Sequence, residues 1–173
     1  MSDFFAHIVD GLDGAVTVEE TKAAAKRADM TGQFSNASDA FSFMTAGKAT
    51  VTFVSKTTGN RFTYRISKSD DGQCYFVGLL NGPNNSSDYK YMGYIRRGLY
   101  CHGRRVPKPG DISLAAPSAK AFAWSWQNIV SGRMPDNLEV WHEGRCGRCA
   151  RKLTVPSSVA SGFGPECQDK LFS

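Results

Sequence analysis

The chain has 173 residues, of which 41% are hydrophobic, and a formal net charge of +5. This composition is ordinary for a globular protein, and the length fits one domain with a small appendage. No apolar run approaches the ~20 residues that span a bilayer. The first residues also lack the basic flank and long apolar core of a signal peptide, so we expect a cytoplasmic protein without a membrane partner.

The charge is unevenly distributed along the chain. Residues 1–40 carry seven acidic and three basic side chains, for a net charge of −4, whereas residues 41–173 carry nine acidic and eighteen basic ones, for +9. A basic body behind an acidic leader favours nucleic acid or another polyanion as the partner. The alternative is a moderately basic surface that has no such partner.

Residues 1–45 are predicted to form an acidic, partly helical leader. Thr17 and Glu20 have the spacing of a capping box, in which each side chain bonds the backbone amide of the other residue. This spacing predicts a helix over residues 17–27. A second short helix is expected over residues 36–44, with Phe41 facing inward.

Residues 46–135 are predicted to form the body, and their hydrophobic pattern begins with the alternation of strands. Phe62, Tyr64 and Ile66 fall on one face of such a strand, with polar side chains between them. The expected strands cover residues 50–54, 61–66, 74–80, 89–95 and, as a short fifth, 99–101. They predict an antiparallel meander of four or five strands and the α+β fold class.

One main helix is predicted over residues 117–131 to cover this sheet. Pro117 suits the first turn and Gly132 the residue after the helix. Phe122, Trp126 and Ile129 fall on one stripe, which Ala119 and Val130 widen. Burial of each large side chain stabilises the fold by roughly 1.5–3 kcal/mol.

Two groups of side chains in the body invite a binding role. Tyrosines stand among basic residues on the predicted sheet, where they either stack on nucleic acid bases or pack in the core. The loop that follows is basic and is predicted to contact phosphates; the alternative is a solvated loop. Its basic residues are Arg96, Arg97, Arg104, Arg105 and Lys108.

Residues 136–173 are predicted to form a zinc module with one structural Zn²⁺. Cys146 and Cys149 are separated by two residues, so a tight turn can direct both sulfurs to one point, and Cys167 falls in the first turn of a short helix. His142 is predicted to be the fourth ligand. Cys74, Cys101 and His102 are rivals for that place, and an open site would leave it to water.

Basic residues surround the predicted ligands. They favour the thiolate form, and they are predicted to contact the partner. These residues are Arg145, Arg148, Arg151 and Lys152.

The stretch CGRCARKLT, a serine-containing spacer and SGFGPEC together resemble a family of short cysteine-rich modules of uncharacterised function. The resemblance covers residues 141–171 and implies a zinc ribbon or short treble clef in a protein of a phage, plasmid or actinobacterium. It carries over Cys146, Cys149 and Cys167 as metal ligands, and His142 with weaker support. Ala150 stands where a second glycine is expected. The family implies no activity and therefore no catalytic residue.

Three functions are consistent with these features. The first is a small zinc-stabilised binding protein of phage or mobile-element origin that contacts nucleic acid. The second is a phage-encoded, anti-CRISPR-like inhibitor that binds a host nucleoprotein or defence complex, using the acidic leader or a face that mimics nucleic acid. The third is a zinc-dependent hydrolase or deaminase with Glu143 or Glu166 as general base. Close-set cysteine sites are usually structural, so the sequence favours binding over catalysis.

Overall fold

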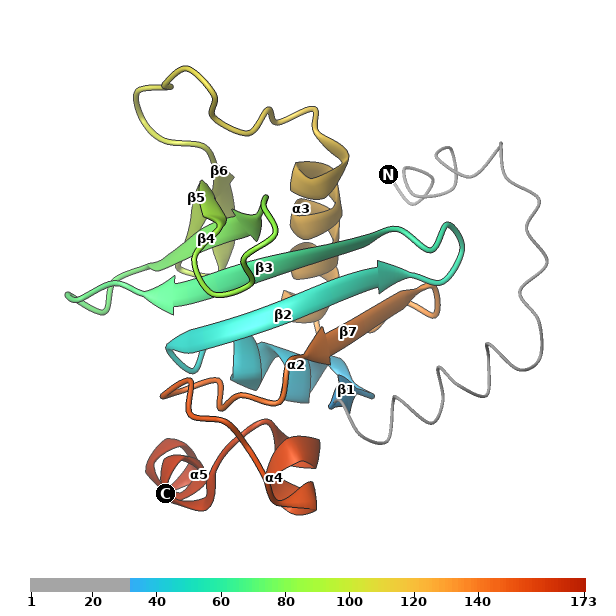
Figure 1. The fold of residues 1–173 in the computed structure, drawn as a ribbon, viewed down its shortest axis with the longest axis vertical. Helices are drawn as coiled ribbons and strands as arrows, with labels where there is room; N and C mark the ends of the chain where they lie inside the picture. The colour runs from blue at the N-terminus through green and yellow to red at the C-terminus, as the bar shows by residue number, and fades with distance from the viewer. Residues whose placement is uncertain (1–31) are drawn as a thin grey trace.

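The computed structural model describes residues 32–173 as an α+β fold, which confirms the predicted class (Figure 1). A seven-stranded antiparallel sheet has the order β1-β7-β2-β3-β4-β5-β6. Helices α2 (Ala37–Met44) and α3 (Pro117–Val130) pack on one face of this sheet. On the other face, which is open to view in Figure 1, the segment between β4 and β5 crosses in front of β3. The helix predicted over residues 17–27 lies outside the described residues.

The predicted meander forms the larger part of the sheet. Its strands pair in chain order, because short turns join each strand to the next. Successive side chains along each strand point to opposite faces of the sheet. Between Val77 and Gly78 the register shifts, at the position opposite the extra residue Met92. The strands are β2 (Lys48–Ser55), β3 (Arg61–Lys68), β4 (Tyr75–Leu80), β5 (Tyr89–Arg96) and β6 (Leu99–His102).

The predicted five-stranded meander is confirmed, and two strands that were not predicted extend the sheet beyond β2. Strand β7 (Leu138–His142) pairs with β2 on one side and with the short β1 (Gln33–Phe34) on the other. Residues 136–173 were predicted to form the zinc module. The alternating burial of β7, which begins inside the predicted module, shows instead that this strand is part of the sheet.

Helix α3 covers the centre of the sheet as predicted. Phe122, Trp126 and Ile129 are each at most 2% exposed, and the Phe122 ring lies 4.9 Å from that of Tyr64, centroid to centroid. The buried Tyr64 hydroxyl donates to the Ser118 carbonyl at 2.7 Å, which satisfies its polar group. Val130 does not widen the buried stripe: it is 41% exposed.

The C-terminal residues pack against α2. They form a hairpin after β7, then α4 (Pro156–Ser161) and α5 (Pro165–Phe172). The Phe43 ring of α2 fills the junction. A Cβ added to Gly147 or Gly162 would lie 2.7 or 2.6 Å from this ring, so only glycine permits so close an approach at either position.

Replacing Phe122 by alanine should lower the free energy of unfolding by about 3–5 kcal/mol, because the ring is fully buried among aromatic neighbours. Urea denaturation followed by circular dichroism measures this change. Leu114→Ala is the matched control, since Leu114 is 65% exposed and its truncation should shift the free energy by less than about 0.5 kcal/mol. Equal effects of the two substitutions would contradict the role given to α3.

Candidate metal centre

Three of the predicted ligands converge on one point. The sulfurs of Cys146, Cys149 and Cys167 all lie within 4.8 Å of one another. The first two stand on the hairpin after β7, and Cys167 stands in the first turn of α5. Three thiols so arranged could hold a metal ion, and thiolate is a ligand that zinc prefers. Within residues 32–173, no fourth histidine, cysteine or carboxylate belongs to this group.

The hairpin holds the first two sulfurs in place through its own backbone. The Cys146 amide donates to the Arg151 carbonyl at 2.9 Å, and the Ala150 amide donates to the Cys146 carbonyl at 2.8 Å. Ala150 has a φ of 63°, the left-handed region that favours glycine. Ala150 thus adopts the backbone conformation that would favour the glycine expected at this position from the family resemblance.

The thiols differ in acidity. Burial raises the pKa of Cys146, but hydrogen bonds from the backbone of Gly164, Cys149 and Arg148 outweigh burial and leave that pKa below its ordinary value. Burial raises the pKa of Cys167, as do the two neighbouring thiols, although the Arg148 guanidinium opposes them. Three thiols at this spacing therefore do not all ionise by themselves, whereas a bound cation would favour all three thiolates.

The structure does not bring His142 to the three thiols. Its Nε2 donates to the Val159 carbonyl at 2.7 Å, and its Nδ1 accepts from the Gly144 amide at 3.0 Å. Both nitrogens of the neutral ring are thus engaged, so neither lone pair is directed to a metal. The ring is buried between Phe34 and Phe43, with centroids 5.4 and 5.1 Å away. His142 therefore attaches α4 to the sheet.

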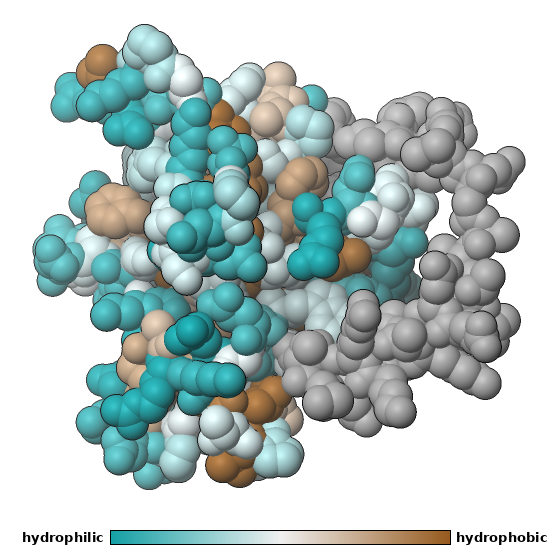
Figure 2. Space-filling model, viewed as in Figure 1, coloured by the Kyte–Doolittle hydropathy of each residue, from teal (hydrophilic) through white to brown (hydrophobic). Residues whose placement is uncertain are grey.

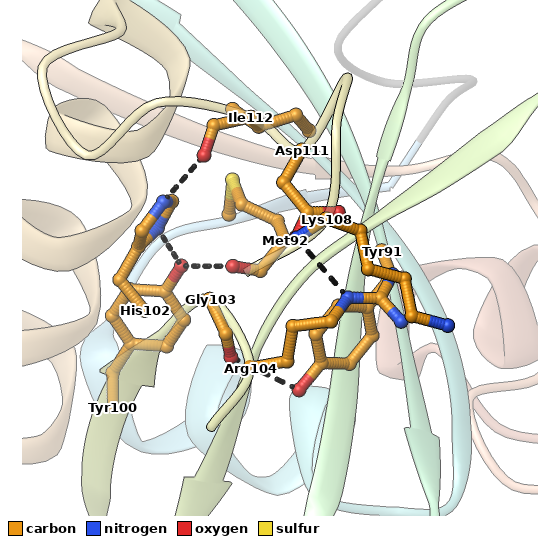
Figure 3. A network of polar contacts seen from close by, with 9 residues as sticks. All are labelled: Tyr91, Met92, Tyr100, His102, Gly103, Arg104, Lys108, Asp111 and Ile112. Atoms are coloured by element: carbon orange, nitrogen blue, oxygen red, sulfur yellow. Dashed lines mark hydrogen bonds and ion pairs between the residues drawn. The ribbon is translucent and has the colours of Figure 1, made fainter. Parts of the chain in front are cut away.

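The rival ligands also lie outside the thiol group. Cys74 and Cys101 are not among its members. His102 donates from Nε2 to the Ile112 carbonyl at 2.8 Å, and its Nδ1 lies 3.0 Å from the Tyr100 hydroxyl (Figure 3). This ring links β6 to the loop that precedes α3.

A cavity of about 380 Å³ opens beside the three thiols. Its described lining contains Glu166 as the one acid and four basic residues. These basic residues are Arg148, Arg151, Lys152 and Lys170. Sequence reasoning missed Lys170, although its spacing of three from Cys167 places both on one face of a helix. Arg145 lies on the other side of the hairpin, with its Nε 3.7 Å from the Glu143 carboxylate.

The basic loop is farther from the metal centre. In Figure 1 the segment after β6 lies at the opposite end of the molecule from α4 and α5. The Arg104 Nε lies 3.3 Å from the Asp111 carboxylate, and its guanidinium carbon lies 4.8 Å from the centroid of the Tyr91 ring (Figure 3). Arg104 is therefore engaged within its own loop, and Arg105 and Lys108 are exposed.

The turn between β5 and β6 holds the remaining predicted contacts. Arg96 and Arg97 are both exposed there, and Arg97 has a φ of 51°. The structure thus divides the predicted contact residues into three separate places: this turn, the loop after β6, and the hairpin of the metal centre.

Comparison with protein families found a match at the C-terminal end. A family of unknown function (DUF6011) matches residues 137–172, which include β7, the three cysteines and both short helices. The curated proteins and the solved structures gave no significant match. Among residues 32–173, no helix has the length and apolar character needed to cross a bilayer. The family description assigns no activity, so the chemistry of the site rests on its own residues.

Replacing Cys149 by serine should release the bound metal, because two thiolates hold a divalent ion much less well than three. Elemental analysis of the purified protein should find about one metal ion per chain before the change and almost none after it. Cys74→Ser is the matched control, since Cys74 lies outside the thiol group. Full metal content in the Cys149→Ser protein would contradict the site.

Burial lowers the pKa of His142, and its hydrogen bond to Val159 offsets only part of that shift. The unfolded chain then binds the proton more tightly than the folded one, so the free energy of unfolding should fall as the pH drops through 6.5, the ordinary value. His142→Gln should show a smaller fall between about pH 7.5 and pH 5.5 in urea denaturation. It should also keep its metal; loss of the metal would make His142 a ligand.

Proposed function

We propose that the protein is a small zinc-stabilised binding protein that contacts nucleic acid through the basic surface around its metal centre. The observation that carries the proposal is the convergence of three thiols and four basic side chains on one cavity of about 380 Å³. The thiols would bind a metal ion, and the basic side chains would bind an anionic partner.

Zinc fits the donor set and the needs of this part of the chain. Thiolates suit Zn²⁺, which takes four ligands in a tetrahedron at structural sites, and the three cysteines would supply three of them. Neither α4 nor α5 has a buried residue, so hydrophobic burial fixes these helices weakly. A zinc ion bound by Cys167 and the hairpin cysteines would link α5 to the body and supply folding free energy. Water or a residue beyond the described ones would complete its coordination.

The phosphates of nucleic acid complement the four basic side chains whose relative positions a bound zinc ion would fix. Arg148, Arg151 and Lys152 belong to the hairpin, and Lys170 belongs to α5. Phosphate contacts from such side chains supply affinity without sequence readout. The relative position of these four charges depends on the link through Cys167. Removal of the metal should therefore weaken binding as well as stability.

The other hypotheses have less support. The inhibitor hypothesis uses either the acidic leader, much of which lies outside the described residues, or a face that mimics nucleic acid, whereas the two hollows around the hairpin are mainly basic. The hydrolase or deaminase hypothesis needs a general base beside the metal. Glu166 lines the cavity beside the thiols, whereas Glu143 lines the other hollow. The phage, plasmid or actinobacterial setting follows from the family resemblance and remains part of the proposal.

The double substitution Arg151→Gln, Lys152→Gln should weaken binding to a single-stranded oligonucleotide. Each lost phosphate contact should reduce the slope of log K against log salt by ~0.7, so the pair should reduce it by ~1.4. Fluorescence anisotropy at several salt concentrations measures both quantities. Lys56→Gln, Arg133→Gln removes the same charge at exposed positions away from the hairpin and is the control. Equal weakening by both pairs, or no binding by the unchanged protein, would contradict the proposal.

A further inference from the structure

The open face of the sheet carries a second basic hollow, with a volume of about 550 Å³. It forms where the start of β2, the end of β3, the segment before β5 and the hairpin after β7 meet. Its basic residues are Lys48, Arg65, Lys68 and Arg145. Figure 2 shows this face of the molecule, on which hydrophilic residues predominate. Only Arg145 belonged to the contact residues predicted from the sequence.

Arg65 is fixed at this hollow by two contacts. Its guanidinium carbon lies 3.8 Å from the centroid of the Tyr89 ring, and its Nη2 donates to the Ser86 carbonyl at 3.0 Å. An arginine held in this way loses little further side-chain entropy when it binds an anion, and its planar fork matches a phosphate. Arg65 is therefore organised before any ligand arrives.

Positive charge dominates the hollow. Glu143 is the one acid of its described lining, and it lies 3.7 Å from the Arg145 Nε. That pair neutralises itself in part, while Lys48, Arg65 and Lys68 face no second carboxylate in the described lining. A concave site of one charge sign concentrates ions of the other sign, so the hollow suits an anion.

An exposed aromatic ring stands beside the hollow on the same face. Lys48 pairs with Ser67, and Ser67 pairs with Phe76, so the three side chains form one row across β2, β3 and β4. Phe76 is 46% exposed, and its ring centroid lies 6.4 Å from that of Tyr91. The row spans two strand spacings, or about 10 Å. It sets an exposed aromatic ring next to the basic hollow.

We propose that this hollow binds a backbone phosphate of single-stranded nucleic acid while Phe76 stacks on a base. The inference rests on the proposed function and assigns the bound nucleic-acid strand a path across the protein surface. Arg145 and Ala150 line the hollow, and Arg148 and Arg151 line the metal cavity. The hairpin is thus a wall shared by two basic sites, along which one strand can run. Only unpaired bases are free to stack on a protein ring.

The test compares two double substitutions at opposite ends of the same pair of strands. Lys48→Gln, Lys68→Gln removes two charges at the hollow, and Lys56→Gln, Arg61→Gln removes two exposed charges at the other end of β2 and β3. Anisotropy with a labelled 12-nucleotide single-stranded DNA should show about tenfold weaker binding, and a salt slope smaller by ~1.4, for the first pair only. Phe76→Ala should weaken binding about fivefold or more. A 12-base-pair duplex should bind more weakly than the single strand.

The outcomes separate this inference from the proposed function. If the unchanged protein binds the single strand but the two double variants weaken it equally, the hollow is not the site, and the proposed function stands. The same conclusion follows if the Arg151, Lys152 pair weakens binding and the Lys48, Lys68 pair does not. If the duplex binds as tightly as the single strand, or Phe76→Ala has no effect, base stacking is wrong. No binding of either nucleic acid overturns both proposals.

Discussion

The repulsion that three ionised thiols at this spacing would exert on one another is the constraint on which the C-terminal part of the structure depends. The sulfurs of Cys146, Cys149 and Cys167 lie within 4.8 Å of one another, and the pKa of Cys167 is raised in part by its two neighbours. A cation removes that repulsion and converts it into attraction. Because α5 buries no residue of its own, the same cation would determine where Lys170 stands relative to the hairpin. The shape of the basic cavity would therefore depend on whether a metal is bound.

The hairpin also joins the body through contacts that need no metal. Phe43 lies against Gly147 and Gly162, and the Lys48 amide donates to the Gly147 carbonyl at 2.7 Å. His142 attaches α4 through the Val159 carbonyl, and a Cβ at Gly32 would overlap its imidazole. These contacts fix the hairpin and α4. Helix α5 has the contact of Phe172 with Phe163, with ring centroids 5.9 Å apart, and a metal bound by Cys167 would add a second link. Loss of metal should therefore affect α5 more than the sheet.

Local patterns in the sequence were sufficient to predict much of the fold. The meander and α3 follow from alternation and from the stripe of Phe122, Trp126 and Ile129, since each pattern is complete within its own element. The three thiols follow from the short spacing of the hairpin pair and from the helix start at Pro165. Sequence reasoning missed β1 and β7 because their pairing joins residues far apart in the chain. The alternation of β7 was present, but its residues were assigned to the zinc module.

The role of His142 could not be predicted from spacing for a related reason. Four residues separate it from Cys146, a spacing that suits a ligand, but its ring nitrogens bond a carbonyl from α4 and an amide of the hairpin. Those partners are fixed only when β7 lies between β1 and β2. The same insertion places the hairpin beside the start of β2, where Arg145 and Lys48 line one hollow. This basic hollow is therefore a product of long-range pairing. A sequence reading assigns its charges to separate segments and has no local pattern from which to assemble them.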